Sequence, residues 1–276
     1  MKYGLDIPTA GEYANPRKLA DLAAEAEQAG WNGFFVWDIF VGDQAIVDPW
    51  VALAAIGMQT QHIRIGAFVT PLPRRRPWQV AREAVALDHL SNGRLIFAAG
   101  LGHQGIDYTA FGEEADPKIR AEKLDESLEI LNGLWTGETF SFHGKHYQVN
   151  EVKFLPKPLQ SPRIPIWVAG GWPNRKPFRR AARWDGISLM TVNQVTNELL
   201  TPQEIREIVA YVKAHRNGSE PFDIAVNGET SSDLKKGAEI VQPYIEAGAT
   251  WWVEYEASRE GFEDYRERIR NGPPRT

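Results

Sequence analysis

Three consecutive arginines, Arg74 to Arg76, follow an apolar run that starts at Ile63, and Pro71, Pro73 and Pro77 stiffen the segment around them. Guanidinium groups bind carboxylates and phosphates through paired hydrogen bonds. These arginines therefore either pair with carboxylates on a solvated rim or hold an anionic cofactor or substrate. A nucleic-acid site is disfavoured, because the net charge is -5 at pH 7 and the chain has no second basic cluster.

Two acidic residues, Glu229 and Glu254, would suit a glycosidase, which needs two carboxyl groups on facing strand ends. The fourth predicted strand ends at Gly100 with no acid, so this pair remains an alternative. The six histidines include no His-x-His pair at a strand end, and His143 and His146 fall in a segment that we expect to form a hairpin. The chain has no cysteine, so we predict no metal site.

The composition is that of an ordinary globular protein, with 276 residues, 43% hydrophobic and 24% charged. No apolar run approaches the ~20 residues that a membrane helix requires, and no long apolar stretch follows the first lysine to serve as a signal peptide. We therefore expect a cytoplasmic protein without membrane or nucleic-acid partners. Ten tryptophans are compatible with a lined ligand cavity, although core packing explains most of them.

Eight short runs of β-branched or aromatic residues recur along the chain, and each is followed by a longer segment with helical spacing. Four of the helices have a capping residue followed by proline, at 15–16, 48–49, 116–117 and 201–202. The predicted strands are 3–6, 33–37, 63–69, 95–99, 166–169, 186–190, 222–226 and 250–254.

Strands that alternate with helices predict parallel strands joined by right-handed crossovers, and eight repeats favour a closed (β/α)8 TIM barrel. An open Rossmann sheet is the alternative, but no G-x-G-x-x-G follows the first strand. We expect one domain over residues 1–276. Residues 139–158 predict a hairpin insertion between the fourth helix and the fifth strand.

The loops that follow barrel strands lie on the carboxyl-terminal face, where barrel enzymes carry their chemistry. Thr70 follows the third strand and is expected near the pocket. Gly100, Gly102 and Gly105 follow the fourth strand, and glycine leaves the backbone open to close approach by another group. His103 is the one histidine on this face, so it is the candidate catalytic residue for proton transfer.

Residues 48–102, "DPWVALAAIGMQTQHIRIGAFVTPLPRRRPWQVAREAVALDHLSNGRLIFAAGLG", closely resemble the bacterial-luciferase-like superfamily of flavin- and deazaflavin-dependent oxidoreductases. Three further stretches match in the same order: "RAEKLDESLEILNGLWTG", "FHGKHYQV" and "PKPLQSPRIPIWVAGG". The resemblance covers most of the chain and implies a (β/α)8 barrel with the cofactor ring at the carboxyl-terminal end of the strands.

The resemblance also implies a role for the end of the third strand, where family members often have a non-proline cis peptide behind the cofactor ring. The matching positions here are Val69 and Thr70, with Phe68 beside them. After the fifth strand, the family loop commonly receives the cofactor phosphate on backbone N–H groups. Gly170 and Gly171 match that loop, and Trp172 is expected to shape the pocket.

The second strand of family members usually ends in an aspartate followed by a histidine. Here Asp38 matches the aspartate and is expected to bind the cofactor, but Ile39 and Phe40 stand where the histidine would be. Isoleucine cannot titrate, so a mechanism that relies on that histidine does not carry over. The missing group strengthens the interest in His103.

The activity implied by the resemblance is oxidation or reduction of a small organic substrate at bound FMN, by hydride transfer or by oxygen activation. The alternative is a coenzyme F420-dependent enzyme, because a deazaflavin carries hydride without activating oxygen. For an FMN enzyme, a flavin reductase is a possible electron source. A homodimer is the expected assembly. A flavin-binding barrel without enzymatic activity is a remote alternative.

Overall fold

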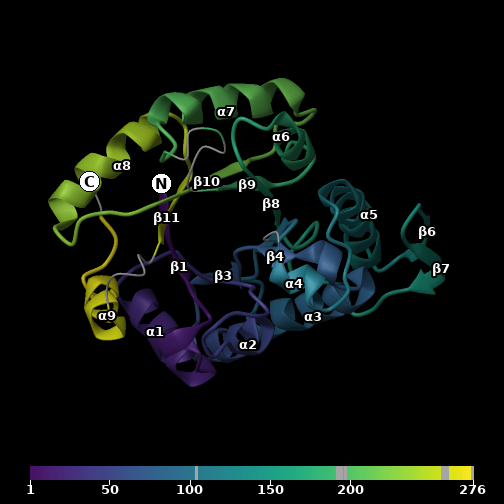
Figure 1. The fold of residues 1–276 in the computed structure, drawn as a ribbon, viewed down its shortest axis with the longest axis horizontal. Helices are drawn as coiled ribbons and strands as arrows, with labels where there is room; N and C mark the ends of the chain where they lie inside the picture. The colour runs from purple at the N-terminus through teal and green to yellow at the C-terminus, as the bar shows by residue number, and fades with distance from the viewer. Residues whose placement is uncertain (103–104, 191–194, 196–197, 256–260, 275–276) are drawn as a thin grey trace.

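A parallel sheet rolled into a barrel occupies the centre of the molecule, with helices around it (Figure 1). The computed structural model describes residues 1–102, 105–190, 195, 198–255 and 261–274. Neighbouring strands follow the order β3-β2-β1-β11-β10-β9-β8-β5-β4. Their bounds are β1 Lys2–Ile7, β2 Gly33–Val36, β3 Arg64–Ala67, β4 Thr70–Pro71, β5 Phe97–Gly100, β8 Ile166–Gly170, β9 Gly186–Leu189, β10 Asp223–Gly228 and β11 Trp251–Tyr255.

The third predicted strand is interrupted, which corrects the prediction of one strand over residues 63–69. Its first half, β3, pairs with β2, and its second half, β4, pairs with β5. Between the halves the peptide bond Phe68–Val69 is cis. A parallel bridge between Ile65 and Leu95 joins β3 to the residues before β5, so the two ends of the strand order meet and the (β/α)8 prediction is confirmed.

The four helices with a predicted capping residue followed by proline begin where the sequence predicts them. Asn15 caps the first by accepting hydrogen bonds from Arg17 N and Lys18 N, and Thr201 forms a capping box with Glu204. The bounds are α1 Pro16–Gln28, α2 Pro49–Gln59, α3 Pro77–Leu90, α4 Ile106–Thr109, α5 Pro117–Trp135, α6 Arg175–Ala181, α7 Pro202–His215, α8 Leu234–Glu246 and α9 Phe262–Arg270, with short 3-10 turns η1 Gly11–Tyr13 and η2 Leu72–Arg74.

Alternate strand residues divide the core into two parts. Leu5, Ile7 and Phe34 belong to the large apolar cluster between strands and helices. Phe35, Trp167 and Trp251 fill the barrel interior, where their ring centroids lie 5.3–5.9 Å apart. Glycine is required beside them, because a Cβ on Gly4 or Gly33 would lie 2.9 or 2.8 Å from the Phe35 ring. These tryptophans therefore pack the interior of the barrel.

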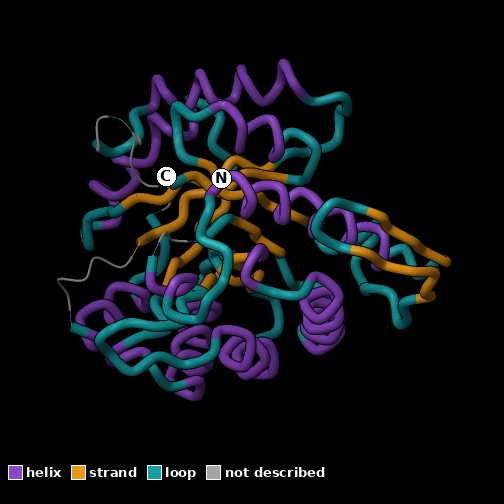
Figure 2. The backbone as a smooth tube through the Cα atoms, turned by 45° about the vertical axis from the view of Figure 1, so that its right-hand side comes forward, coloured by secondary structure: helices purple, strands orange, loops and turns teal. Residues whose placement is uncertain are grey.

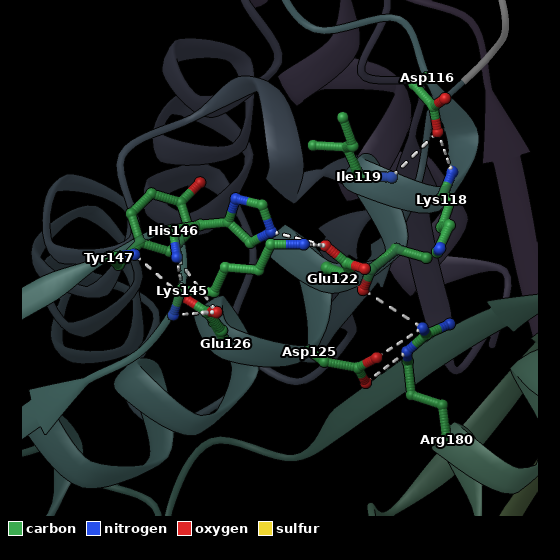
Figure 3. Close-up of polar contacts among 11 residues, drawn as sticks. Asp116, Lys118, Ile119, Glu122, Asp125, Glu126, Lys145, His146, Tyr147 and Arg180 are labelled. Carbon is green, nitrogen blue, oxygen red and sulfur yellow. Dashed lines mark hydrogen bonds and ion pairs between the residues drawn. The ribbon is translucent and has the colours of Figure 1, made fainter.

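The chain between α5 and the fifth barrel strand forms an antiparallel hairpin of β6 Thr139–His143 and β7 Gln148–Lys153, which projects from the side of the molecule (Figure 2). Glu126 of α5 holds its turn by accepting hydrogen bonds from the backbone N–H groups of Lys145, His146 and Tyr147 (Figure 3). The preceding residue of α5, Asp125, binds Arg180 of α6 through both carboxylate oxygens at 2.7 and 2.8 Å.

Candidate functional site

The strands of the barrel end on a common face, and the side chains at their inner ends form what we call the barrel mouth: Asp6, Trp37, Phe68, Val69, Asn227 and Tyr255. Trp37 and Tyr255 lie uppermost, with stacked rings whose centroids are 6.0 Å apart. Both are partly exposed. The mouth thus combines a flat aromatic surface with polar groups below it.

The apolar side of the mouth is built at the interruption between β3 and β4. Phe68 stacks on Phe35 at 5.1 Å, and Phe68 and Val69 both pack against the inner cluster of the barrel. The non-proline cis peptide lies between these two residues, at the position that the resemblance indicated. Thr70 follows in β4 and is buried.

Asp6 is the acidic residue of the mouth and is 5% exposed. Its Oδ2 accepts a hydrogen bond from Asn227 Nδ2 at 3.2 Å, and the Trp37 side chain is a second hydrogen-bonding neighbour. Burial outweighs these hydrogen bonds and raises the pKa of Asp6 well above its ordinary value. Within the described structure, Asp6 Oδ1 and Asn227 Oδ1 have no hydrogen-bond partner.

Asp38 lies beside the mouth in a buried ion network. Its two carboxylate oxygens pair with Arg74 at 2.7 Å and Arg75 at 2.9 Å, and its side chain is fully buried. Arg74 also reaches Asp107 at 2.9 Å, and Asp107 accepts a hydrogen bond from Val41 N. Burial raises the pKa of Asp38, while the two guanidinium groups oppose this effect. Pairing with carboxylates is therefore the correct interpretation for Arg74 and Arg75.

Gly100 at the end of β5 and Gly102 just after it pack against protein atoms, whereas a Cβ on Gly105 would meet nothing within 4 Å. A Cβ on Gly100 would lie 2.6 Å from Val69 Cγ2, and one on Gly102, whose φ is +74°, would lie 2.7 Å from Pro71. Tyr108 is buried and donates its hydroxyl to the carbonyl of Leu101 at 2.7 Å. These contacts close the loop after β5 against the segment around β4.

The predicted catalytic residue His103 lies outside the described residues. The other histidines are far along the chain from any carboxyl end of a barrel strand, in or next to helices and in the hairpin. The described residues include no cluster of histidine and acidic side chains suited to a metal ion.

The loop after β8 contains the predicted phosphate-binding residues. Gly171 accepts a hydrogen bond on its carbonyl from Asn174 N, and the Asn174 side chain caps α6 at Lys176 N. A Cβ on Gly170 would lie 3.1 Å from Ile187. Trp172 is 3% exposed and belongs to the core between strands and helices, beneath the Arg175 guanidinium at 3.8 Å.

The structure does not support the glycosidase alternative, because Glu229 and Glu254 are not arranged as a catalytic pair. Glu254 lies on the outer side of β11, where it accepts hydrogen bonds from Thr230 N and from the indole of Trp252. Glu229 is exposed in the loop after β10. The two carboxyl groups therefore do not face each other across the barrel mouth.

A cavity of about 430 Å³ lies beside the mouth, between the ion network and the hairpin. Phe40, Arg76, Lys123 and Tyr147 are among its lining residues. It mixes cationic and acidic groups and does not open into the interior of the barrel. The mouth is the stronger candidate because it holds buried polar atoms that hydrogen-bond to no group in the part of the chain that the structure describes.

Sequence reasoning missed Asp6 and Asn227. Both lie in or next to strands that were predicted. Side chains of a strand alternate between its two faces, and Tyr3, Leu5 and Ile7 of β1 face the helices. Asp6 must therefore face the interior of the barrel. An acidic residue at an interior position of a barrel strand is the signal that would have found it.

Comparison with known proteins shows where this architecture occurs. The sequence model of the luciferase-like monooxygenase family matches residues 4–270. An F420-dependent glucose-6-phosphate dehydrogenase from Intrasporangium calvum is 31% identical over 240 residues, which cover 83% of this chain and 70% of that protein. The oxygenase component of a flavin-dependent trigonelline monooxygenase from Acinetobacter baylyi is 26% identical over 195 residues, 70% of this chain and 52% of that protein.

The curated relatives are longer than the region they share with this chain, which spans between 49% and 70% of their length. Solved structures match almost end to end. Monooxygenase RslO1 from Streptomyces bottropensis has a TM-score of 0.79 at 19% identity, covering 98% of this chain and 97% of that one. An F420-dependent tetrahydromethanopterin reductase from Methanopyrus kandleri has a TM-score of 0.79 at 16% identity, covering 99% and 98%.

Proposed function

Because the chain belongs to the luciferase-like monooxygenase family, we propose that it is an oxidoreductase that binds FMN or coenzyme F420 at the barrel mouth and acts on a small organic substrate. Relatives named as F420-dependent and as flavin-dependent support this proposal. The observation that carries it is the mouth itself, where apolar ring surfaces lie next to buried polar atoms without partners.

The residues of the mouth suit a flat tricyclic ring. Stacked Trp37 and Tyr255 and the Phe68–Val69 segment offer the apolar surface that its faces need. Asp6 Oδ1 and Asn227 Oδ1 offer the polar groups that its edge, or a substrate beside it, would engage. Val69, Thr70, Gly100 and Gly102 are our proposed positions behind the ring. For Asp38 we propose an indirect role, since both of its oxygens already bind arginines.

The loop after β8 is our proposed phosphate end. Gly171 has no side chain that would stand between its backbone N–H group and an anion. Gly170 and Trp172 pack against α6 and so fix the loop. Arg180 forms an ion pair with Asp125, and Arg175 stacks on Trp172. We therefore expect backbone N–H groups of this loop to hold the cofactor phosphate.

A bound reduced flavin or deazaflavin supplies a hydride, and a reduced flavin also activates oxygen. The chain's own contribution is to hold the ring flat, exclude water from its face and supply a proton. FMN with oxygen activation is our first candidate. F420-dependent hydride transfer is the second, favoured by the relative that covers 83% of this chain. The oxygenase-component relative supports a separate flavin reductase as electron source in the first case, and a homodimer stays a proposal.

Turnover with each reduced cofactor tests the proposal. The purified chain would be supplied with reduced FMN in air and with reduced F420 without oxygen, against aldehydes, ketones and conjugated enones. We expect cofactor oxidation that depends on substrate with one of the two cofactors. Substrate-independent oxidation in every combination would contradict an enzymatic role and favour a flavin-binding barrel without enzymatic activity.

A further inference from the structure

Asp6 is unusual among the described acidic residues, because it is buried inside the barrel and no cation neutralises it. Asp38, by contrast, is buried with two arginines. Glu254 is buried outside the barrel, close to Arg268 at 4.0 Å and among hydrogen-bond donors. A carboxylate without a cation or enough donors is costly to bury, and the usual outcome is that the group keeps its proton.

The hydrogen bonds around Asp6 indicate where that proton lies. Asn227 Nδ2 donates to Oδ2, so Oδ2 acts as the carbonyl oxygen of a neutral acid and Oδ1 carries the hydrogen. Oδ1 has no partner in the described structure. The groups that face Asp6 from β2, β10 and β11 are Trp37, Asn227 and Tyr255, and none of them is a base or a cation at neutral pH.

The position of Asp6 gives this proton access to the proposed ring site. Asp6 is the second-last residue of β1 and pairs in register with Tyr255 of β11 and Phe35 of β2. Trp37, Tyr255 and Asn227 above and beside it are all partly exposed. The carboxyl group therefore lies at the floor of the mouth, within a rim of partly exposed side chains, and its Oδ1 is directed to no other group of the described structure.

We propose that Asp6 is the proton donor of the barrel mouth, held neutral and oriented by Asn227, and that it serves reduction of a polar C=O or conjugated C=C bond. This inference rests on the hydride-transfer form of the proposed function, with either reduced FMN or reduced F420 as the hydride source. The substrate carbon receives a hydride from the reduced cofactor, and the electron pair of the double bond moves to the oxygen or to the second carbon. The Asp6 proton goes to that atom. The Asp6 carboxylate then regains a proton from water, and the cofactor leaves oxidised. Asp6 thus fills the role that the isoleucine at position 39 cannot fill.

The protonation state is tested first, without cofactor. With 13C-labelled aspartate, NMR titration of the parent protein should show one carboxyl group that stays protonated at neutral pH, and its signal should be absent in Asp6→Asn. The amide has the shape and the donor and acceptor layout of a neutral acid, so this variant should fold. If every aspartate of the parent is ionised at neutral pH, the inference is wrong whatever the variant does.

The catalytic role is tested with the holoenzyme. We expect Asp6→Asn to lower kcat roughly 10²- to 10⁴-fold, with cofactor Kd changed less than about twofold, and to remove the fall in kcat as pH rises. Glu254→Gln is the matched control, because it makes the same change at a buried carboxyl group outside the barrel, and it should turn over as the parent does. Unchanged kcat and pH profile in Asp6→Asn would overturn the inference while leaving the proposed function intact. Failure of the parent to bind either cofactor would instead overturn both.

Discussion

Asp6 loses its contact with water on folding and gains no positive charge in exchange. In the unfolded chain an aspartate titrates near ~3.9, whereas burial raises the pKa of Asp6 in the folded protein. Between these two values the unfolded state releases a proton that the folded state keeps. The contribution of Asp6 to the free energy of unfolding is therefore fully present at low pH. It is lost as the pH rises from the pKa of the unfolded chain to the pKa of the folded protein.

Asp6→Asn removes this pH dependence. Relative to the parent, the variant should gain free energy of unfolding as the pH rises above about 4, by up to ~1.4 kcal/mol for each pH unit until Asp6 ionises in the folded protein. Urea denaturation at several pH values measures this difference. Asp43→Asn, at an exposed position, controls for the change of charge. A constant offset between variant and parent across the range would show that Asp6 ionises normally.

Individual side chains show what sequence patterns can and cannot predict. The cis peptide was located correctly, because it lies at Phe68–Val69, beside the positions that the resemblance indicated, although β3 itself ends at Ala67. The pairing of Asp38 with Arg74 and Arg75 was only one of two interpretations of the arginines, because guanidinium groups suit carboxylates and phosphates equally well. Asp6 was missed because its significance depends on the absence of a cation nearby, which only the fold reveals.

Elements around the mouth are joined by the Arg74 network. Its guanidinium group connects Asp38 after β2 to Asp107 in α4, and Arg74 itself lies in η2. The three charged groups are each at most 10% exposed, so removal of the arginine leaves two buried carboxylates, of which Asp38 keeps only Arg75. Breaking a buried pair in this way costs much more than breaking a surface pair.

Arg74→Leu should therefore lower the free energy of unfolding by about 3 kcal/mol, measured by urea denaturation at neutral pH. Arg17→Leu makes the same change at an exposed position of α1 without an ion pair in the described structure, and it should have an effect within about 0.5 kcal/mol. Equal stability of the two variants would mean that the network does not hold the mouth segments together.

At the level of elements, capping residues carried most of the predictive information. Asn15, Asp48, Asp116 and Thr201 all accept the hydrogen bonds that their positions predict, because a cap acts within a few residues of sequence. The division into β3 and β4 was not predicted, because it depends on long-range pairing: β3 pairs with β2, whereas β4 pairs with β5. The short helix α4 was also absent from the prediction. The role of its Asp107 could not be predicted either, because it depends on the ion pair with Arg74 that the fold creates.

The two ends of the chain are joined across the whole molecule. β1 pairs with β11 over five positions from Lys2 to Asp6, and the Trp31 indole donates to Ile269 O in α9. Glu25 of α1 binds Arg266 and Arg270 of α9, and these arginines lower its pKa to about 2. Because these contacts join the first and last segments, either half of the chain on its own would lose them.

We therefore predict one domain over the full length, which unfolds in one step. Tryptophan fluorescence and far-ultraviolet circular dichroism should give coincident urea transitions, and limited proteolysis should cut loops without releasing a folded half. Two stable fragments, or two separated transitions, would contradict this prediction.

The described residues contain no helix long and apolar enough to cross a membrane.

The central claim is that the barrel mouth binds a flavin or deazaflavin, and equilibrium titration of the purified chain with FMN and with F420 tests it most directly. Quenching of cofactor fluorescence should report saturable binding of at least one of them. Gly171→Val should weaken that binding by roughly 1–3 kcal/mol, because a side chain there obstructs the backbone N–H groups proposed to hold the phosphate. Gly218→Val, where an added Cβ would meet nothing within 4 Å, should bind as the parent does. Failure of the parent to bind either cofactor would contradict the account.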